Sequence, residues 1–118
     1  MRWKEKSGLP DRAFVKAVSE MEQGLIDADL GGHILKKRVS LPGRGKRGGA
    51  RVIVATEKAD RWFFLYGFEK NERDTITTRE LRFFQEMATD FLEFDERQVE
   101  IALAAGEFVE IVDENKEV

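Results

Sequence analysis

The chain has 118 residues, of which 42% are hydrophobic and 36% are charged, and its formal net charge is −3. This length supports one domain with one hydrophobic core and is too short for two. The absence of cysteine excludes disulfides, thiolate metal sites and cysteine nucleophiles. No apolar stretch approaches the roughly 20 residues that a membrane-spanning helix needs, and no secretory signal is apparent. We therefore expect a single cytoplasmic domain over residues 1–118, with no membrane association.

The net charge hides a strong segregation of charge along the chain. No acidic residue lies between Asp29 and Glu57, and this interval contains seven cations. From Phe84 to the end of the chain there are 11 acidic residues, with Arg97 and Lys116 as the only cations. We therefore expect the local field, rather than the total charge, to select partners.

The first predicted element is a helix over residues 10–23. Its apolar side chains recur at spacings of three and four residues and form one stripe, with Asp11 near the start and Gly24 as the expected stop. Residues 27–32 are rich in Asp and Gly and are expected to form a polar connection to the next element.

A short strand is expected over residues 33–40, followed by a loop. Along this strand Lys36 and Arg38 fall on one side and Lys37 on the other, because successive side chains of a strand alternate. Residues 41–49 contain four glycines and one proline and are expected to form the loop.

Two further strands are expected over residues 51–56 and 61–68, joined as a hairpin by a turn at 58–60. The second of them contains the sequence Trp-Phe-Phe-Leu-Tyr at 62–66, which is a nearly continuous apolar run. Such a run is typical of a central strand that is covered on both faces.

The C-terminal half of the chain predicts two helices and one short strand. Thr77, with Glu80 three residues later, forms a capping-box pattern before an amphipathic segment. Asp95 marks the start of a second helix and Gly106 its end. A last strand is expected over residues 108–112, which gives the order helix, three strands, two helices, strand.

The acid-free basic segment is the first candidate for function. Its cations have no acidic partners nearby in the sequence, and its glycines let the backbone approach a phosphate closely. We interpret it as a clamp for an RNA backbone, whose binding should weaken as salt rises. The alternative is a solvated loop that holds an acidic partner protein. The candidate RNA-binding residues are Lys36, Arg38, Arg44, Lys46 and Arg47, together with Tyr66, which could stack on a base.

A second candidate is a set of cations that the sheet could bring to one concave face. Its members are Lys37, Arg51, Lys70 and Arg73, although a charged turn such as 70–74 is usually only a turn. Cleavage of RNA by its own 2′-hydroxyl requires removal of the hydroxyl proton, stabilisation of a pentavalent phosphorane and protonation of the leaving 5′-oxygen. Arg and Lys can stabilise the phosphorane, and a Lys crowded by other cations can act as base or acid. This chemistry needs no metal.

The histidine and the paired aspartates give no comparable pattern. His33 is the only histidine, follows two glycines and has no nucleophile suggested nearby, so we expect a structural or surface role rather than catalysis. Asp27 and Asp29 lie in a Gly-rich segment, where Asp is an ordinary turn residue. We therefore expect no metal site and no cofactor.

Three blocks of the sequence carry a family resemblance. They are Gly24–Arg51 with its Leu-Gly-Gly and Lys-Lys-Arg motifs, Phe64–Asp74 with Tyr-Gly-Phe and Lys-Asn-Glu-Arg-Asp, and the closing segment Gly106–Ile111. Together they resemble the RelE/HigB-like toxins of type II toxin–antitoxin systems, in the RelE/ParE superfamily, over nearly the whole chain.

The resemblance implies an α+β fold with a small twisted antiparallel sheet and flanking helices. It also implies a toxin that cleaves mRNA on the ribosome and is neutralised by a co-encoded antitoxin. The family's basic catalytic positions would carry over onto Lys37, Arg51, Lys70 and Arg73. Members usually begin with a short strand, whereas residues 1–9 here resemble the start of a helix, so we expect that strand to be missing or reduced. A sheet edge opened in this way would be covered by a partner or by a second copy of the chain.

Two hypotheses for function remain open at this point. In the first, the chain is a ribosome-dependent mRNA endoribonuclease. In the second, it is a non-catalytic binding toxin, either a gyrase poison or a degenerate toxin that acts through its antitoxin, because superfamily members differ in target. We further expect an acidic antitoxin segment to cover residues 36–51 and to pair with the exposed sheet edge.

Overall fold

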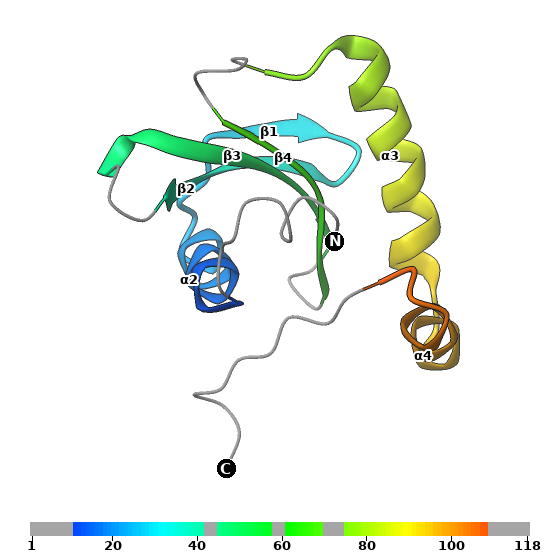
Figure 1. The fold of residues 1–118 in the computed structure, drawn as a ribbon. Helices are drawn as coiled ribbons and strands as arrows, with labels where there is room; N and C mark the ends of the chain where they lie inside the picture. Colours follow the sequence, from blue (N-terminus) through cyan, green and yellow to red (C-terminus); the bar gives the residue numbers. More distant parts are fainter. Residues whose placement is uncertain (1–10, 42–44, 58–60, 70–74, 109–118) are drawn as a thin grey trace.

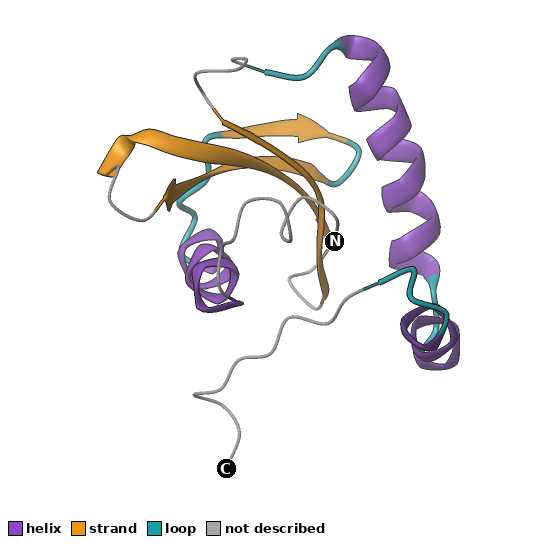
Figure 2. Ribbon diagram, viewed as in Figure 1, coloured by secondary structure: helices purple, strands orange, loops and turns teal. Residues whose placement is uncertain are grey.

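The computed structural model describes residues 11–41, 45–57, 61–69 and 75–108. Within these ranges, three helices accompany one antiparallel sheet of four strands (Figures 1 and 2). The predicted α+β class, a small antiparallel sheet with flanking helices, is therefore confirmed. The elements are α2 (Asp11–Glu22), β1 (Ala28–Gly31), β2 (Ile34–Leu41), β3 (Gly45–Glu57), β4 (Arg61–Glu69), α3 (Thr78–Glu93) and α4 (Glu96–Ala104).

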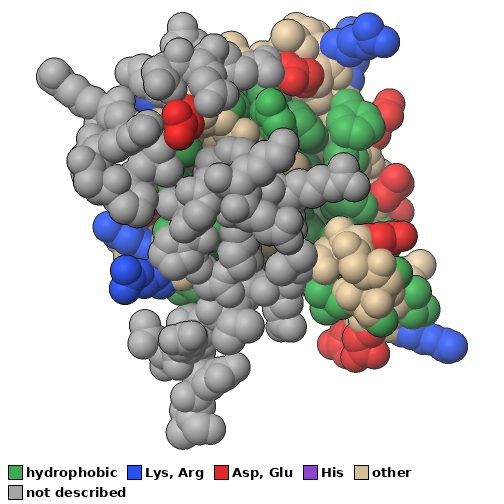
Figure 3. All heavy atoms as spheres, viewed as in Figure 1, with side chains coloured by type: hydrophobic (Ala, Val, Ile, Leu, Met, Phe, Trp, Pro, Cys, Tyr) green, Lys and Arg blue, Asp and Glu red, His purple; other side chains and the backbone are tan. Residues whose placement is uncertain are grey.

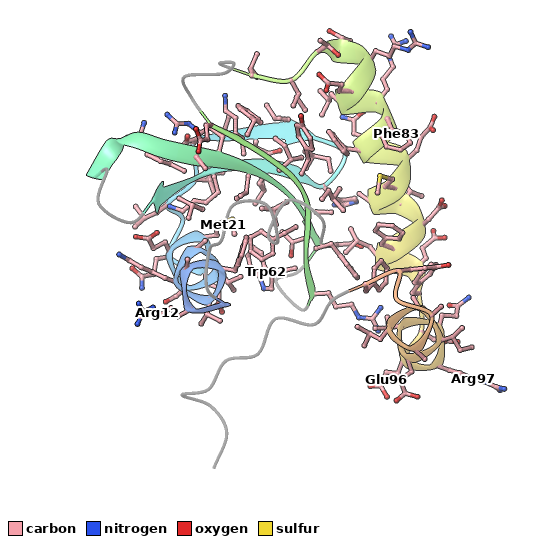
Figure 4. All side chains as sticks on the ribbon, viewed as in Figure 1. Arg12, Met21, Trp62, Phe83, Glu96 and Arg97 are labelled. Atoms are coloured by element: carbon pink, nitrogen blue, oxygen red, sulfur yellow. The ribbon has the colours of Figure 1, made fainter. Side chains whose placement is uncertain are left out.

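The sheet lies between two helices, in the order β1-β2-β3-β4. Helix α2 packs on one face and α3 on the other, and α4 follows at the end of α3 (Figure 1). Each face has its own apolar cluster. The cluster beneath α2 includes Phe14, Ala17, Met21, Val39, Val52, Val54 and Phe64, and that beneath α3 includes Ile34, Ile53, Ala55, Phe68, Phe84 and Ala88. In Figure 4 the side chains of Met21 and Trp62 occupy the space between α2 and the sheet.

The predicted end of the first helix, the predicted starts of the next two and the predicted end of the last are confirmed by their capping geometry. Gly24 has φ +88°, its N–H donates to the Met21 carbonyl, and the next N–H donates to the Glu20 carbonyl. This is a Schellman ending of α2, and Gly106 ends α4 in the same way. Thr77 and Asp95 begin α3 and α4 with complete capping boxes. Among the described residues, no helix is long and apolar enough to cross a membrane.

The strand boundaries differ from the prediction in two places. Residues 28–31 were predicted as part of a connection, but they form β1. The strand is stabilised by backbone hydrogen bonds to β2, and its short sequence, which contains Asp and Gly, has no pattern that predicts a strand. Strand β3 begins at Gly45 inside the predicted loop 41–49, since the ladder to β2 uses backbone groups that glycine also has.

Within the described residues, the aromatic strand is not central as predicted. Strand β4 stands at the end of the order of the described strands, and the interior strands are β2 and β3. Its side chains are apolar on both sides because Phe64 contributes to the α2 cluster while Phe63 and Tyr66 pack in the α3 cluster. The apolar pattern of β4 therefore reflects the coverage of its two faces by the two clusters. The predicted last strand, apart from Phe108, and the expected reduction of the first strand both fall outside the described residues.

A tight turn between β1 and β2 anchors α3 to the sheet. Three consecutive residues of this turn, Gly31, Gly32 and His33, have positive φ. The Gln85 side chain of α3 donates from Nε2 to the Gly31 carbonyl at 3.2 Å, and a Cβ on Gly32 would lie 2.7 Å from the Gln85 Cγ. Glycine at position 32 is therefore favoured for two reasons: it adopts the left-handed backbone of the turn, and it leaves space for the Gln85 side chain of α3.

We expect Gly32→Ala to lower the free energy of unfolding by about 3 kcal/mol, because left-handed strain and the clash with Gln85 add. Gly24→Ala is the matched control, since Gly24 has φ +88° but an added Cβ would meet nothing within 4 Å; it should cost about 1 to 2 kcal/mol. Urea unfolding measures both. In a Gln85→Ala background, Gly32→Ala should cost no more than the control does, and an unchanged cost there would contradict the clash.

Candidate nucleic-acid interface

Helix α3 covers only one end of its sheet face. It reaches the β1–β2 turn through Gln85, and Phe84 stacks on Tyr66 with ring centroids 5.7 Å apart. In Figure 1 the β1 arrow ends beside α3, whereas the end of β2 and the start of β3 extend to the opposite side. The part of this face near the β2–β3 hairpin therefore lies beyond α3.

Basic residues lie on that part of the α3-side face. Arg38 of β2 pairs with Arg51 of β3, which in turn pairs with Phe68 of β4. In the next row along the sheet, Lys36 pairs with Ile53 and Ile53 with Tyr66. Residues in register share a face, so Lys36, Arg38, Arg51 and Tyr66 point to the same side of the sheet.

Arg51 is the buried member of this set. It is 6% exposed, and its Nε lies 3.0 Å from a carboxylate oxygen of Asp27. Its Nη1 lies 3.4 Å from the Ala50 carbonyl oxygen. Arg38 is exposed and Lys36 is half-buried. The arrangement thus combines one guanidinium held by a carboxylate with two more accessible cations, which is suited to contact with consecutive phosphates.

Lys37 lies on the opposite face of the sheet. It pairs in register with Val52, a member of the α2 cluster, and it is 7% exposed. Its Nζ lies 3.3 Å from a carboxylate oxygen of Glu20 on α2. The expectation that Lys37 and Arg51 meet on one concave face is therefore wrong, because residues 51 and 52 of β3 point to opposite sides.

The remaining predicted site residues are placed only in part. Strand β3 contains Lys46 and Arg47, but their side chains are not described. Arg44, Lys70 and Arg73 lie outside the described residues. Their roles therefore stay predictions. Tyr66 is half-buried against Phe84 and Phe68, so a base could reach only the part of the ring that these neighbours leave open.

Two acidic residues hold the buried cations of the sheet, and only Asp27 belongs to the α3-side face, whereas Glu20 on α2 lies on the opposite side. Asp27 and Glu20 each pair with one of the two charged side chains that are buried among the described residues. Neither pairing has a signal in sequence spacing, because each acid is more than 15 positions from its partner. Asp29 has a separate role and accepts the Gly31 N–H at 2.9 Å across the turn. No group of metal-ligating side chains was found in the described part of the chain.

The electrostatic contrast within the chain persists in the fold. Acidic side chains gather over α3 and α4 in the view of Figure 3, while Glu96 and Arg97 of α4 point outward in Figure 4. The basic residues of β2 and β3 belong to the other part of the fold. We therefore expect an anion to be attracted more strongly to the β2–β3 end than to the two C-terminal helices, where acidic side chains outnumber Arg79, Arg82 and Arg97.

Comparison with known proteins identifies the family. The model of the family described as "RelE toxin of RelE / RelB toxin-antitoxin system" matches residues 1–111. Comparisons with curated proteins and with solved structures each gave no match. The matched region spans nearly all of the 118 residues, so the resemblance seen in the sequence motifs is confirmed. The chain belongs to the RelE toxin family and is the toxin component of a toxin–antitoxin system.

Proposed function

We propose that this toxin is a cytoplasmic, ribosome-dependent mRNA endoribonuclease that uses basic residues and the substrate's own 2′-hydroxyl. The observation that supports the proposal best is the position of Arg51. Its guanidinium is held by Asp27 on the α3-side face of the sheet, in register with Arg38 and one row from Lys36. The family implies an antitoxin partner. The ribosome and mRNA are the partners that this proposal adds.

The proposed reaction is an internal transfer at phosphorus. The 2′-oxygen loses its proton and bonds to the adjacent phosphorus, while the bond from phosphorus to the 5′-oxygen breaks and that oxygen takes a proton. Arg51 would donate hydrogen bonds to the phosphorane oxygens, where negative charge develops. Arg38 and Lys36 would hold flanking phosphates, and Tyr66 would contact a base.

The roles of the other predicted catalytic residues divide by position. Lys70 is the first residue after β4 and Arg73 the fourth, and they remain our candidates for proton transfer and for further charge stabilisation. Lys37 points toward α2 and contacts Glu20, and we propose a structural role for it rather than a catalytic one. A buried pair of this kind fixes the position of α2 on the sheet, because either charge alone would be costly to bury.

The antitoxin is proposed to act by covering the same surface. An acidic segment laid over residues 36–51 would neutralise the exposed cations and block RNA. Strand β1 is an edge of the described sheet and offers backbone groups to such a segment or to a second copy of the chain. Binding of the antitoxin should therefore weaken as salt rises.

The first test is cleavage of mRNA on programmed ribosomes. We expect wild-type protein to cut, and Arg51→Ala to lower the turnover rate about 100-fold or more, as for loss of one donor to a transition-state oxyanion. Lys37→Met and His33→Asn should stay within about threefold of wild type. His33 is five positions beyond Arg38 along the pairing of β2, so it is roughly 16 Å from the proposed site.

Other outcomes of that test are informative. Intact transcripts with wild-type protein would refute the endoribonuclease proposal, and inhibition of gyrase supercoiling by the same sample would support the binding-toxin alternative. A loss of activity in Lys37→Met that equals the loss in Arg51→Ala would restore Lys37 to the catalytic set. Circular dichroism of every variant controls for loss of folding.

The second test is the salt dependence of RNA binding. We expect Arg38→Ala and Lys36→Ala each to weaken binding of a short single-stranded RNA and to reduce the slope of log affinity against log salt by about 0.7. Arg97→Ala on α4, far along the chain and exposed, is the control and should leave the slope unchanged. Filter binding at several salt concentrations measures the slopes, and unchanged slopes for both sheet variants would refute an RNA contact at this face.

A further inference from the structure

Asp27 is the acidic residue that contacts the proposed RNA-binding face. Its carboxylate meets the Nε of Arg51 at 3.0 Å, and the two side chains are 22% and 8% exposed. The contact reaches from the residue before β1 to β3, so it passes over the intervening strand β2. We infer that Asp27 is a positioning residue, which orients the Arg51 guanidinium for hydrogen bonding to RNA phosphate. This inference rests on the proposed function.

The position of Asp27 is itself well determined. The Schellman ending at Gly24 turns the chain out of α2, with the Leu25 N–H bonded to the Glu20 carbonyl. Three residues after Gly24, the Asp27 N–H donates to the Lys36 carbonyl at 2.9 Å and joins the ladder to β2. The backbone that carries the carboxylate is therefore hydrogen-bonded both to the end of α2 and to β2. Such a fixed backbone is what a group that orients another side chain requires.

The contact with Asp27 engages only one part of the Arg51 guanidinium. A guanidinium has five N–H donors, and Asp27 contacts the Nε edge while the Ala50 carbonyl lies near Nη1. The N–H groups that remain keep a fixed direction, because two neighbours restrict rotation of the side chain. An arginine that is already ordered loses less conformational entropy when it binds a phosphate than a free one does.

On this face, one group of charges orients Arg51 and another attracts RNA. Asp27 offsets the charge of Arg51, so Arg51 acts chiefly as an oriented donor. Exposed Arg38 and half-buried Lys36 supply the net positive charge on this face. Loss of Asp27 should therefore lower turnover more than it lowers RNA affinity. The opposite arrangement, in which Asp27 competes with phosphate for Arg51, predicts tighter RNA binding when the carboxylate is removed.

The chain offers a matched control on the other face of the sheet. Glu20 contacts Lys37 at 3.3 Å, so it pairs with the second buried cation without touching the proposed RNA face. Glu20→Gln and Asp27→Asn remove the same charge from similar pairs. If the two variants differ in cleavage rate, the difference shows that the location of the carboxylate on the RNA-facing side matters. If both variants only lose stability, the result shows no more than the loss of a buried ion pair.

The experiment measures kcat and KM for mRNA cleavage on programmed ribosomes. We expect Asp27→Asn to lower kcat about tenfold or more, with KM within about threefold of wild type, and Asp27→Glu to recover part of the loss. Glu20→Gln should stay within about threefold. Asp27→Asn should add little to Arg51→Gln in the double variant, because both act through one guanidinium. The inference would be overturned if the fold-losses in kcat of the two single variants multiplied in the double variant, or if Asp27→Asn cleaved faster than wild type.

A second arm separates this inference from the endoribonuclease proposal. If wild-type protein leaves mRNA intact, the proposed function fails, and the positioning role is judged by NMR of the arginine Nε–H groups. We expect the Arg51 Nε–H to exchange slowly in wild type, to shift when a short single-stranded RNA is added, and to lose both properties in Asp27→Asn but not in Glu20→Gln. An Arg51 signal that is unchanged by Asp27→Asn, or unaffected by RNA, would overturn the inference in either case.

Discussion

The alternation of side chains along β3 is the constraint on which the rest of the structure depends. Val52 and Val54 enter the cluster beneath α2, while Ile53 and Ala55 enter the cluster beneath α3. A slip of one residue in the register would exchange the two sets and turn Arg51 toward the apolar cluster beneath α2. The same alternation assigns Arg51 to the α3 side.

Both buried cations of the described sheet are held by acids from one short stretch of chain. Glu20 at the end of α2 contacts Lys37, and Asp27 after the helix contacts Arg51. Ion pairs of this kind add little to stability compared with apolar substitutes, but they orient their members strongly. The end of α2 and the chain that follows it therefore organise both faces of the sheet, one for packing and the other, in our proposal, for RNA.

Much of the fold could be predicted because its signals are local. The capping boxes at Thr77 and Asp95 and the glycine endings at Gly24 and Gly106 involve residues within one or two turns of each helix end. Strand β1 gave no comparable signal, since its stability comes from pairing with β2. The place of β4 at the end of the described strand order could not be predicted either, because the apolar pattern reports coverage of its faces and not the number of its hydrogen-bonded neighbours.

For the candidate site, too, the local features could be predicted from the sequence and the contacts between strands could not. By itself, the sequence determined the concentration of cations between Asp29 and Glu57, the alternation that separates Lys37 from Lys36 and Arg38, and the family. Only the tertiary structure decided that Arg51 shares a face with Arg38 while Lys37 faces α2, and that Asp27 contacts Arg51. The physical reason is that the face of a strand residue depends on register, and an ion pair depends on distances across strands. Neither quantity is encoded in the spacing of residues along the chain.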